Sequence, residues 1–174
     1  MAARVAALRV GAGIEEGTDV GPLIDEGGLK KVEAHIEDAR GGGATVRVGA
    51  ARHERGGTFF QPTLLEGVTM DMQMANEETF GPVAGLTKFD GEEEAIRIAN
   101  DTPMGLASYF FSRDIGRVTR VSEALEYGMV GVNTGAMSTT VAPFGGIKES
   151  GLGREGSKHG LDEWTELKYV CVGL

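Results

Sequence analysis

The sequence predicts an α/β fold, with a mostly parallel sheet flanked by helices and a further strand at the end of the chain. Between residues 82 and 133, short apolar runs alternate with segments of helical periodicity, which is typical of parallel strands joined by helices. The 174 residues are 41% hydrophobic and 25% charged, so the chain is long and apolar enough to bury a core. In such sheets, sites form at the carboxyl ends of strands.

The first half of the chain is expected to begin and end its helices at recognisable signals. Residues 1–11 resemble the last turns of a helix without an N-cap, which is marginal alone, so we expect earlier architecture before Met1. Asp25 is expected to cap a helix that stops at residues 41–43. Its apolar stripe has helical spacing and comprises Leu29, Val32, Ile36 and Ala39. Strands are expected at residues 44–50, 60–65 and 82–89, with a turn-rich loop at 53–59.

The second half continues the alternation of helices and strands. Residues 91–101 predict a helix, and the nearly continuous apolar run at 106–112 predicts a strand buried on both faces. Asp114 is expected to cap a helix that ends by Gly128. The remaining expected elements are a buried strand at 129–133, a long loop to Gly156, a short helix at 158–162 and a terminal strand at 166–172.

Composition excludes several classes of protein. A formal charge of -9 disfavours nucleic acid as a partner, because phosphate binding needs clustered Lys and Arg. The chain has no apolar run long enough for a membrane helix and no signal peptide, so we expect no membrane partner and a cytoplasmic location. Cys171 is the single cysteine; it lies between two valines, which predicts a buried hydrophobe rather than a nucleophile. The three histidines lack metal-ligand spacing, so no metal site is expected.

The stretch SGLGREG contains G-x-G-x-x-G at Gly151, Gly153 and Gly156, the pattern of a dinucleotide-binding turn. That turn needs a strand before it and the rest of a βαβ unit of roughly 30 residues after it. The preceding PFGGIKE is not a typical strand, and too little chain follows Gly156. We therefore expect these glycines to allow tight turns with positive φ in a structural loop.

Two other segments carry groups that could bind a ligand. In EETFGP, the carboxylate of Glu78 suits the hydroxyls of a ribose, and the ring of Phe80 could lie against a flat heteroaromatic ring. The alternative is a surface turn with Phe80 in the core. The hydroxyls at residues 138–140 could bind an anion, or they could belong to an ordinary solvated loop.

Several segments occur in an order that resembles the carboxyl-terminal part of an aldehyde dehydrogenase. They are GTDVGPLID, FFQPTL, EETFGPV, IANDTPMGL, GMVGVNTG, PFGGIKESGLGREG and EWTELKYVCVGL. Within this family, EALEYGMVGVNTG and GREGSKHGLDEWTELKYVCVGL most resemble the succinate-semialdehyde dehydrogenase branch. The resemblance implies that residues 1–145 are the later part of the catalytic domain. Residues 146–174 would be a linker, a short helix and an oligomerisation strand.

The resemblance also implies a reaction. A cysteine thiolate attacks a small aldehyde, the thiohemiacetal gives a hydride to NAD or NADP, and a glutamate activates the water that hydrolyses the thioester. It implies that Glu78 holds the nicotinamide ribose and that Phe80 packs near the nicotinamide. Ser138 would contact the substrate carboxylate, and Phe144 would form a wall of the aldehyde pocket.

The same resemblance places the nucleophilic cysteine and the general-base glutamate before Met1, so no catalytic residue is assigned in this chain and the chain alone is expected to be inactive. It also implies a homo-oligomer joined through the terminal strand. Two alternatives remain open at this point. The chain could be a non-catalytic interaction module that pairs with full-length subunits, or a nucleotide binder that uses GLGREG.

Overall fold

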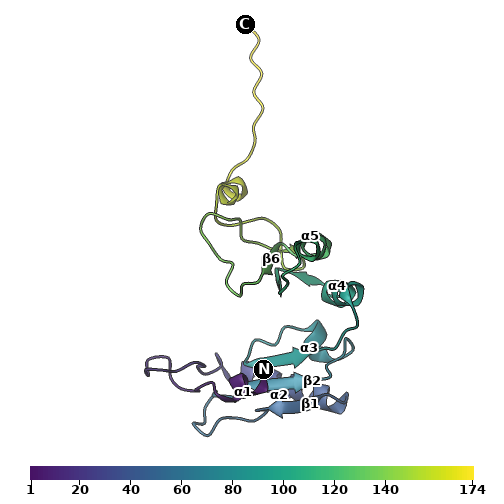
Figure 1. The fold of residues 1–174 in the computed structure, drawn as a ribbon. Helices are drawn as coiled ribbons and strands as arrows, with labels where there is room; N and C mark the ends of the chain where they lie inside the picture. The colour runs from purple at the N-terminus through teal and green to yellow at the C-terminus, as the bar shows by residue number, and fades with distance from the viewer. The chain divides into compact units, whose positions relative to one another are not determined.

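The computed structural model describes residues 1–174 and divides into two compact units, Met1–Phe89 and Asp90–Leu174 (Figure 1). Each unit contains both helices and strands, as the sequence predicts. The division falls at a different place from the functional boundary expected between residues 145 and 146. That boundary concerns a role in a larger protein and stays a prediction.

The first unit is a three-stranded sheet with a long helix packed on it. Its elements are α1 (Ala2–Ala6), α2 (Glu26–Gly41), β1 (Thr45–Val48), β2 (Thr63–Glu66), α3 (Gln73–Asn76) and β3 (Val83–Leu86). The strand order is β1-β2-β3; β1 and β2 are antiparallel, whereas β2 and β3 are parallel. The core joins the stripe of α2, which includes the fully buried Leu29, to Phe60 and Leu65.

Helix α2 begins and ends where its sequence signals predict. Asp25 Oδ1 accepts a hydrogen bond from the Gly28 backbone N–H at 2.8 Å, which satisfies one of the unpaired donors of the first turn. The helix ends at Gly41 with Gly42 as its C-cap, and all four residues of the predicted stripe are buried. The predicted cap, stop and buried face are therefore confirmed.

The second unit pairs two helices with two small sheets. Its elements are α4 (Glu92–Asn100), β4 (Met104–Gly105), β5 (Ala107–Phe110), α5 (Ile115–Ala124), β6 (Met129–Val132), β7 (Ile147–Lys148) and the 3-10 helix η1 (His159–Trp164). Strands β5 and β6 are parallel, and β4 and β7 are antiparallel. Asp114 caps α5 by accepting from the Arg117 N–H at 2.9 Å, as predicted. The helix ends at Ala124, a turn before Gly128.

The expectation of one mostly parallel sheet is wrong, because the chain forms three small sheets with two parallel and two antiparallel pairings. The alternation of strands and helices between residues 82 and 133 identifies β3, β5 and β6 correctly but not the two-residue strands β4 and β7. It does not identify their partners: β3 pairs with β2, which precedes it in the chain, and not with β5. Strand pairing depends on which backbone edges meet, and this is not written in local periodicity.

Two further expectations about burial and length are wrong. Strand β5 is not buried on both faces, since Tyr109 is 49% exposed and β6 is its one strand neighbour. The first helix stops at Ala6, and Val10 instead forms a parallel bridge with Val20.

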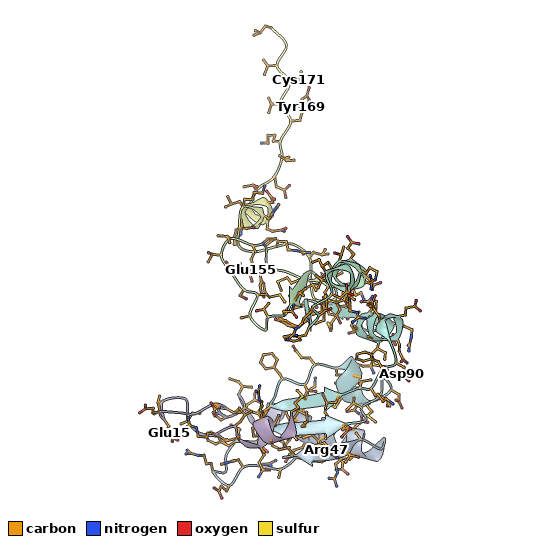
Figure 2. All side chains as sticks on the ribbon, in the orientation of Figure 1. Glu15, Arg47, Asp90, Glu155, Tyr169 and Cys171 are labelled. Atoms are coloured by element: carbon orange, nitrogen blue, oxygen red, sulfur yellow. The ribbon has the colours of Figure 1, made fainter.

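The terminal strand expected at residues 166–172 is not formed within this chain, and its predicted pairing with another subunit stays a prediction. No strand is present after β7, and the residues that follow η1 are exposed. Figure 2 shows Tyr169 and Cys171 on a terminal segment that runs away from the rest of its unit. Cys171 is therefore exposed and not a buried hydrophobe. A strand exists only when its N–H and C=O groups find a neighbouring strand, and this segment has none within the chain.

Candidate functional site

The segment from Glu77 to Gly81 connects α3 to β3 and carries two of the predicted site residues. Glu78 is exposed and makes no side-chain hydrogen bond or ion pair in the structure. The ring of Phe80 is 80% exposed, so the alternative that places it in the core is wrong. A free carboxylate and an uncovered aromatic ring two residues apart form a surface to which a ribose and a flat ring could bind.

The other two predicted site residues meet in the second unit. Phe144 is half-buried, and its backbone exchanges two hydrogen bonds of 2.8 Å with Glu155. Ser138, in the loop before Phe144, is exposed. A cleft of about 410 Å³ is lined by Ser138, Thr139, Thr140, Phe144, Glu155 and Gly156. Hydroxyls and an aromatic side chain thus share one cleft, where they could contact the polar and apolar parts of a small molecule.

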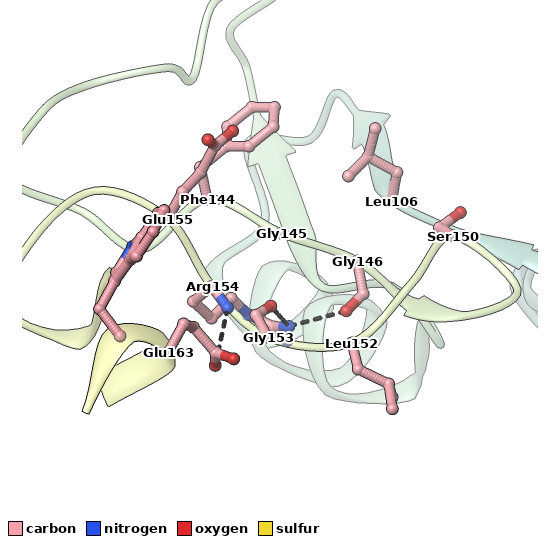
Figure 3. A pocket seen from close by; sticks show the side chains of 11 residues that line it. Leu106, Phe144, Gly145, Gly146, Ser150, Leu152, Gly153, Arg154, Glu155 and Glu163 are labelled. Atoms are coloured by element: carbon pink, nitrogen blue, oxygen red, sulfur yellow. Dashed lines mark hydrogen bonds between the residues drawn. The ribbon is translucent and has the colours of Figure 1, made fainter. Parts of the chain in front are cut away.

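Phe144 also borders a second cleft, of about 480 Å³, shown in Figure 3. Arg154 Nη1 donates to the carbonyl oxygens of Gly146 and Gly153, each at 2.7 Å. The Arg154 backbone N–H donates to Glu163 Oε1 at 3.3 Å. Because its Nη1 is engaged by backbone carbonyls, Arg154 stabilises the shape of this loop.

The glycines of SGLGREG have the role expected of a structural loop. Gly151, Gly153 and Gly156 have φ of 106°, 84° and 69°, a region that side chains other than glycine rarely adopt. No α-helix opens at Gly156, and the element that follows is the short η1. The strand–turn–helix context of a dinucleotide-binding turn is therefore missing, and the predicted positive φ is confirmed.

Several of the pKa shifts in the structure belong to exposed ion pairs, whereas burial raises the pKa of Tyr127. Hydrogen bonds from Arg55 lower the pKa of Glu15, and hydrogen bonds from Arg52 lower the pKa of Glu33. No group of three or more His, Cys, Asp or Glu side chains gathers as a metal site would require. No helix is long and apolar enough to span a bilayer.

The sequence pattern assigns no role to one buried polar residue, His35. His35 lies beside the apolar stripe of α2, and the structure buries it to 2% exposure against the segment that carries Glu78 and Phe80. The periodicity of α2 places His35 near the buried face. It does not reveal the partner, Thr79, which lies far along the chain.

The structure brings Glu78 and Phe80 together on one segment and Ser138 and Phe144 together on one cleft. The two pairs belong to different units of the chain. Neither pair includes a thiol, and the exposed Cys171 is the chain's one cysteine.

Comparison with known proteins gives the same family throughout. The chain is 57% identical over 173 residues to the 3-sulfolactaldehyde dehydrogenase of Pseudomonas putida. The matched region covers 99% of this chain and 36% of that relative. It is 56% identical over 170 residues to the NADP(+) succinate-semialdehyde dehydrogenase of Escherichia coli (strain K12), covering 98% of the chain and 35% of the relative.

A solved structure agrees with these relatives. The succinate-semialdehyde dehydrogenase of Burkholderia pseudomallei superposes with a TM-score of 0.96 at 59% identity, covering 99% of this chain and 36% of that one. The chain thus spans about a third of the length of the proteins it matches. The model of the aldehyde dehydrogenase family matches residues 1–170. The chain belongs to the aldehyde dehydrogenase family.

Proposed function

We propose that this chain acts as part of an NAD(P)-dependent aldehyde dehydrogenase that oxidises a small aldehyde bearing an anionic group, with succinate semialdehyde as the first candidate. The observation that carries the proposal is the cleft that Ser138 and Phe144 share. A hydroxyl can donate to a carboxylate, and an aromatic ring can pack on the methylene carbons between the two ends of the substrate. Both relatives described above are named for aldehydes that carry an acidic group, a sulfonate in one and a carboxylate in the other.

The cofactor part of the proposal depends on Glu78 and Phe80. The carboxylate of Glu78 is free of protein partners, so both oxygens can accept hydrogen bonds from ribose hydroxyls. The exposed ring of Phe80 offers a face for the nicotinamide. NAD or NADP would accept the hydride when bound. Glu78 and Phe80 suit the nicotinamide and its ribose, which the two nucleotides share. They leave the choice between NAD and NADP open.

The chemical step needs a thiolate and a base that we assign to other parts of the complete enzyme. Cys171 is exposed on the terminal segment and has no hydrogen-bonding base, so it lacks the environment that activates a thiol. We therefore propose that the 174-residue chain alone does not reduce NAD(P) in the presence of succinate semialdehyde. We also propose the cytoplasm as its compartment, since a single thiol outside any disulfide fits a reducing environment.

The test compares two substrates in the complete enzyme that carries this sequence. Ser138→Ala is expected to raise KM for succinate semialdehyde by about tenfold, the value of one hydrogen bond to a charged group, and to leave KM for the uncharged butanal unchanged. Val141→Ala, which alters an exposed residue of the same loop, is the matched control. An equal effect of Ser138→Ala on both substrates would contradict the carboxylate contact.

One observation favours a second function, a non-catalytic module that pairs with full-length subunits. The segment from Glu166 to Leu174 has exposed apolar side chains, including Leu167 and Tyr169, and free backbone groups. Such an edge could add to the sheet of another subunit. Co-purification of the tagged chain with the full-length enzyme from cells tests this function, and the absence of association counts against it.

A further inference from the structure

Helix α2 contacts the segment that precedes β3, between Gln73 and Gly81, at several residues. Asp38 Oδ2 accepts from the Gln73 N–H at 2.8 Å, at the start of α3. Lys31 Nζ lies 3.5 Å from Glu77 Oε2. A Cβ added at Gly81 would collide with the side chain of Val32. The α2 residues in these contacts are spaced so that they share one face of the helix.

His35 lies on the same face and makes the most buried of the polar contacts. Its Nδ1 is 2.6 Å from Thr79 Oγ1, and its Nε2 is 3.5 Å from Glu77 Oε2. The imidazole is 2% exposed, whereas the Glu77 side chain is 56% exposed. A buried polar ring that loses its partner is costly, so the bond between His35 and Thr79 fixes one position of the segment strongly.

Glu77 and Thr79 both point toward α2, and the residues between and after them point outward. The backbone at Glu77 is extended, and in extended backbone successive side chains lie on opposite sides, so holding Glu77 against the helix turns Glu78 away from it. The Gly81 N–H donates to the Thr79 carbonyl at 2.8 Å, and this closes a tight turn at Phe80. The exposure of Glu78 and Phe80 agrees with this arrangement. The contacts of Glu77 and Thr79 with α2 thus determine the positions of the Glu78 and Phe80 side chains.

We propose that His35 is a positioning residue of the nicotinamide-nucleotide site. It acts through Thr79 and Glu77, and it holds Glu78 and Phe80 in the orientation that a ribose and a nicotinamide ring require. This inference rests on the cofactor role proposed above for Glu78 and Phe80. A segment held in its bound conformation loses less entropy when the nucleotide binds, so its affinity is higher than that of a loose segment.

Three variants of the complete enzyme separate the hydrogen bond from the volume of the ring. His35→Leu keeps an apolar side chain in the core and removes the polar atoms. His35→Asn keeps a polar atom near the place of Nδ1, and Thr79→Val removes the hydroxyl from the other side. Ile36→Val is the matched control, because it removes one buried methylene from the same helix without removing a hydrogen bond.

Two measurements report on positioning. Hydrogen–deuterium exchange of the peptide covering Glu77–Gly81, without nucleotide, is expected to be faster in His35→Leu and Thr79→Val than in the wild type and Ile36→Val. Calorimetric titration with NAD⁺ and with NADP⁺ is expected to give a Kd raised by up to about tenfold in the same two variants. His35→Asn is expected to restore both values toward those of the wild type.

The outcomes distinguish failure of this inference from failure of the proposed function. If Glu78→Gln and Phe80→Ala weaken nucleotide binding while His35→Leu and Thr79→Val leave both measurements unchanged, the positioning role is wrong and the cofactor site stands. If Glu78→Gln and Phe80→Ala do not affect binding, the cofactor site is wrong and the inference fails with it. If His35→Asn behaves like His35→Leu, the hydrogen bond to Thr79 is not what positions the segment.

Discussion

The loop glycines of this chain differ in whether their surroundings leave room for a side chain. Gly153 has φ of 84°, and a Cβ there would lie 2.7 Å from the Glu163 carboxylate. Gly135, in the loop after β6, has open space around its Cα. An alanine at Gly153 would therefore be strained by its backbone conformation and by a close contact. An alanine at Gly135 would meet neither constraint.

Gly153→Ala is expected to destabilise the chain by about 1–2 kcal/mol, because alanine is strained at positive φ. The affinity of the Gly153→Ala variant for NAD⁺ should equal that of the wild type, because the glycines of SGLGREG shape a structural loop. Urea unfolding gives the first value and calorimetric titration the second. Gly135→Ala is the control and should stay within about 0.5 kcal/mol of the wild type. Loss of NAD⁺ binding in Gly153→Ala alone would revive the dinucleotide-binding interpretation of SGLGREG.

At the scale of elements, ion pairs between helices complement the apolar contacts. Glu92, in the first turn of α4, accepts from Arg117 Nε at 2.8 Å and from Arg120 Nε at 3.0 Å. Both arginines lie on α5, and Asp114 caps that helix. The hydrogen bonds from Arg120 and then Arg117 hold the pKa of Glu92 below its ordinary value of 4.5. One carboxylate therefore links two helices of the second unit.

The pH dependence of stability follows from this shift. Because the pKa of Glu92 is lower in the folded chain than in the unfolded chain, its contribution is fully present above about pH 4.5 and is lost as the pH falls through the lowered value. Glu92→Gln is expected to reduce stability at neutral pH, and its difference from the wild type should shrink as the pH falls below 4.5.

Urea unfolding at several pH values and two salt concentrations measures this difference. Glu93→Gln, at an exposed position on the same helical turn, is the matched control and should follow the wild type. A difference between Glu92→Gln and the wild type that stays constant from neutral to acidic pH would show that the charge of Glu92 does not link the helices.

At the scale of the whole molecule, the chain exposes many large apolar side chains. Phe111 is 74% exposed, Trp164 is 87% exposed and Tyr169 is 88% exposed. Soluble monomers rarely expose large contiguous apolar patches, and unpaired strand edges invite association. The apolar side chains of residues 166–174 therefore need a partner to become buried.

The purified chain is expected to self-associate at micromolar concentration, because association removes these apolar side chains from water. Sedimentation velocity measures the distribution of species. Deleting residues 166–174 should shift that distribution toward the monomer, whereas Val141→Ser, at an exposed site outside the terminal segment, should leave it unchanged. A clean monomer of the intact chain at this concentration contradicts the prediction.

The sequence by itself determined those features that depend on neighbours along the chain. The cap at Asp25, the stripe of α2 and the positive φ of Gly153 follow from side-chain chemistry and helical spacing within a few residues. The motifs in their order also identified the family, now shown by the match over residues 1–170. The assigned roles of Glu78, Phe80, Ser138 and Phe144 stay predictions.

Tertiary structure alone decided the features that join distant segments. Strand β3 pairs with β2, the expected terminal strand has no neighbour, and His35 meets Thr79 across 44 positions of sequence. Local periodicity tells which face of an element is apolar, but the partner of that face depends on how the whole chain packs. For this reason the sequence could place His35 near a buried face and could not show that it holds the segment carrying Glu78 and Phe80.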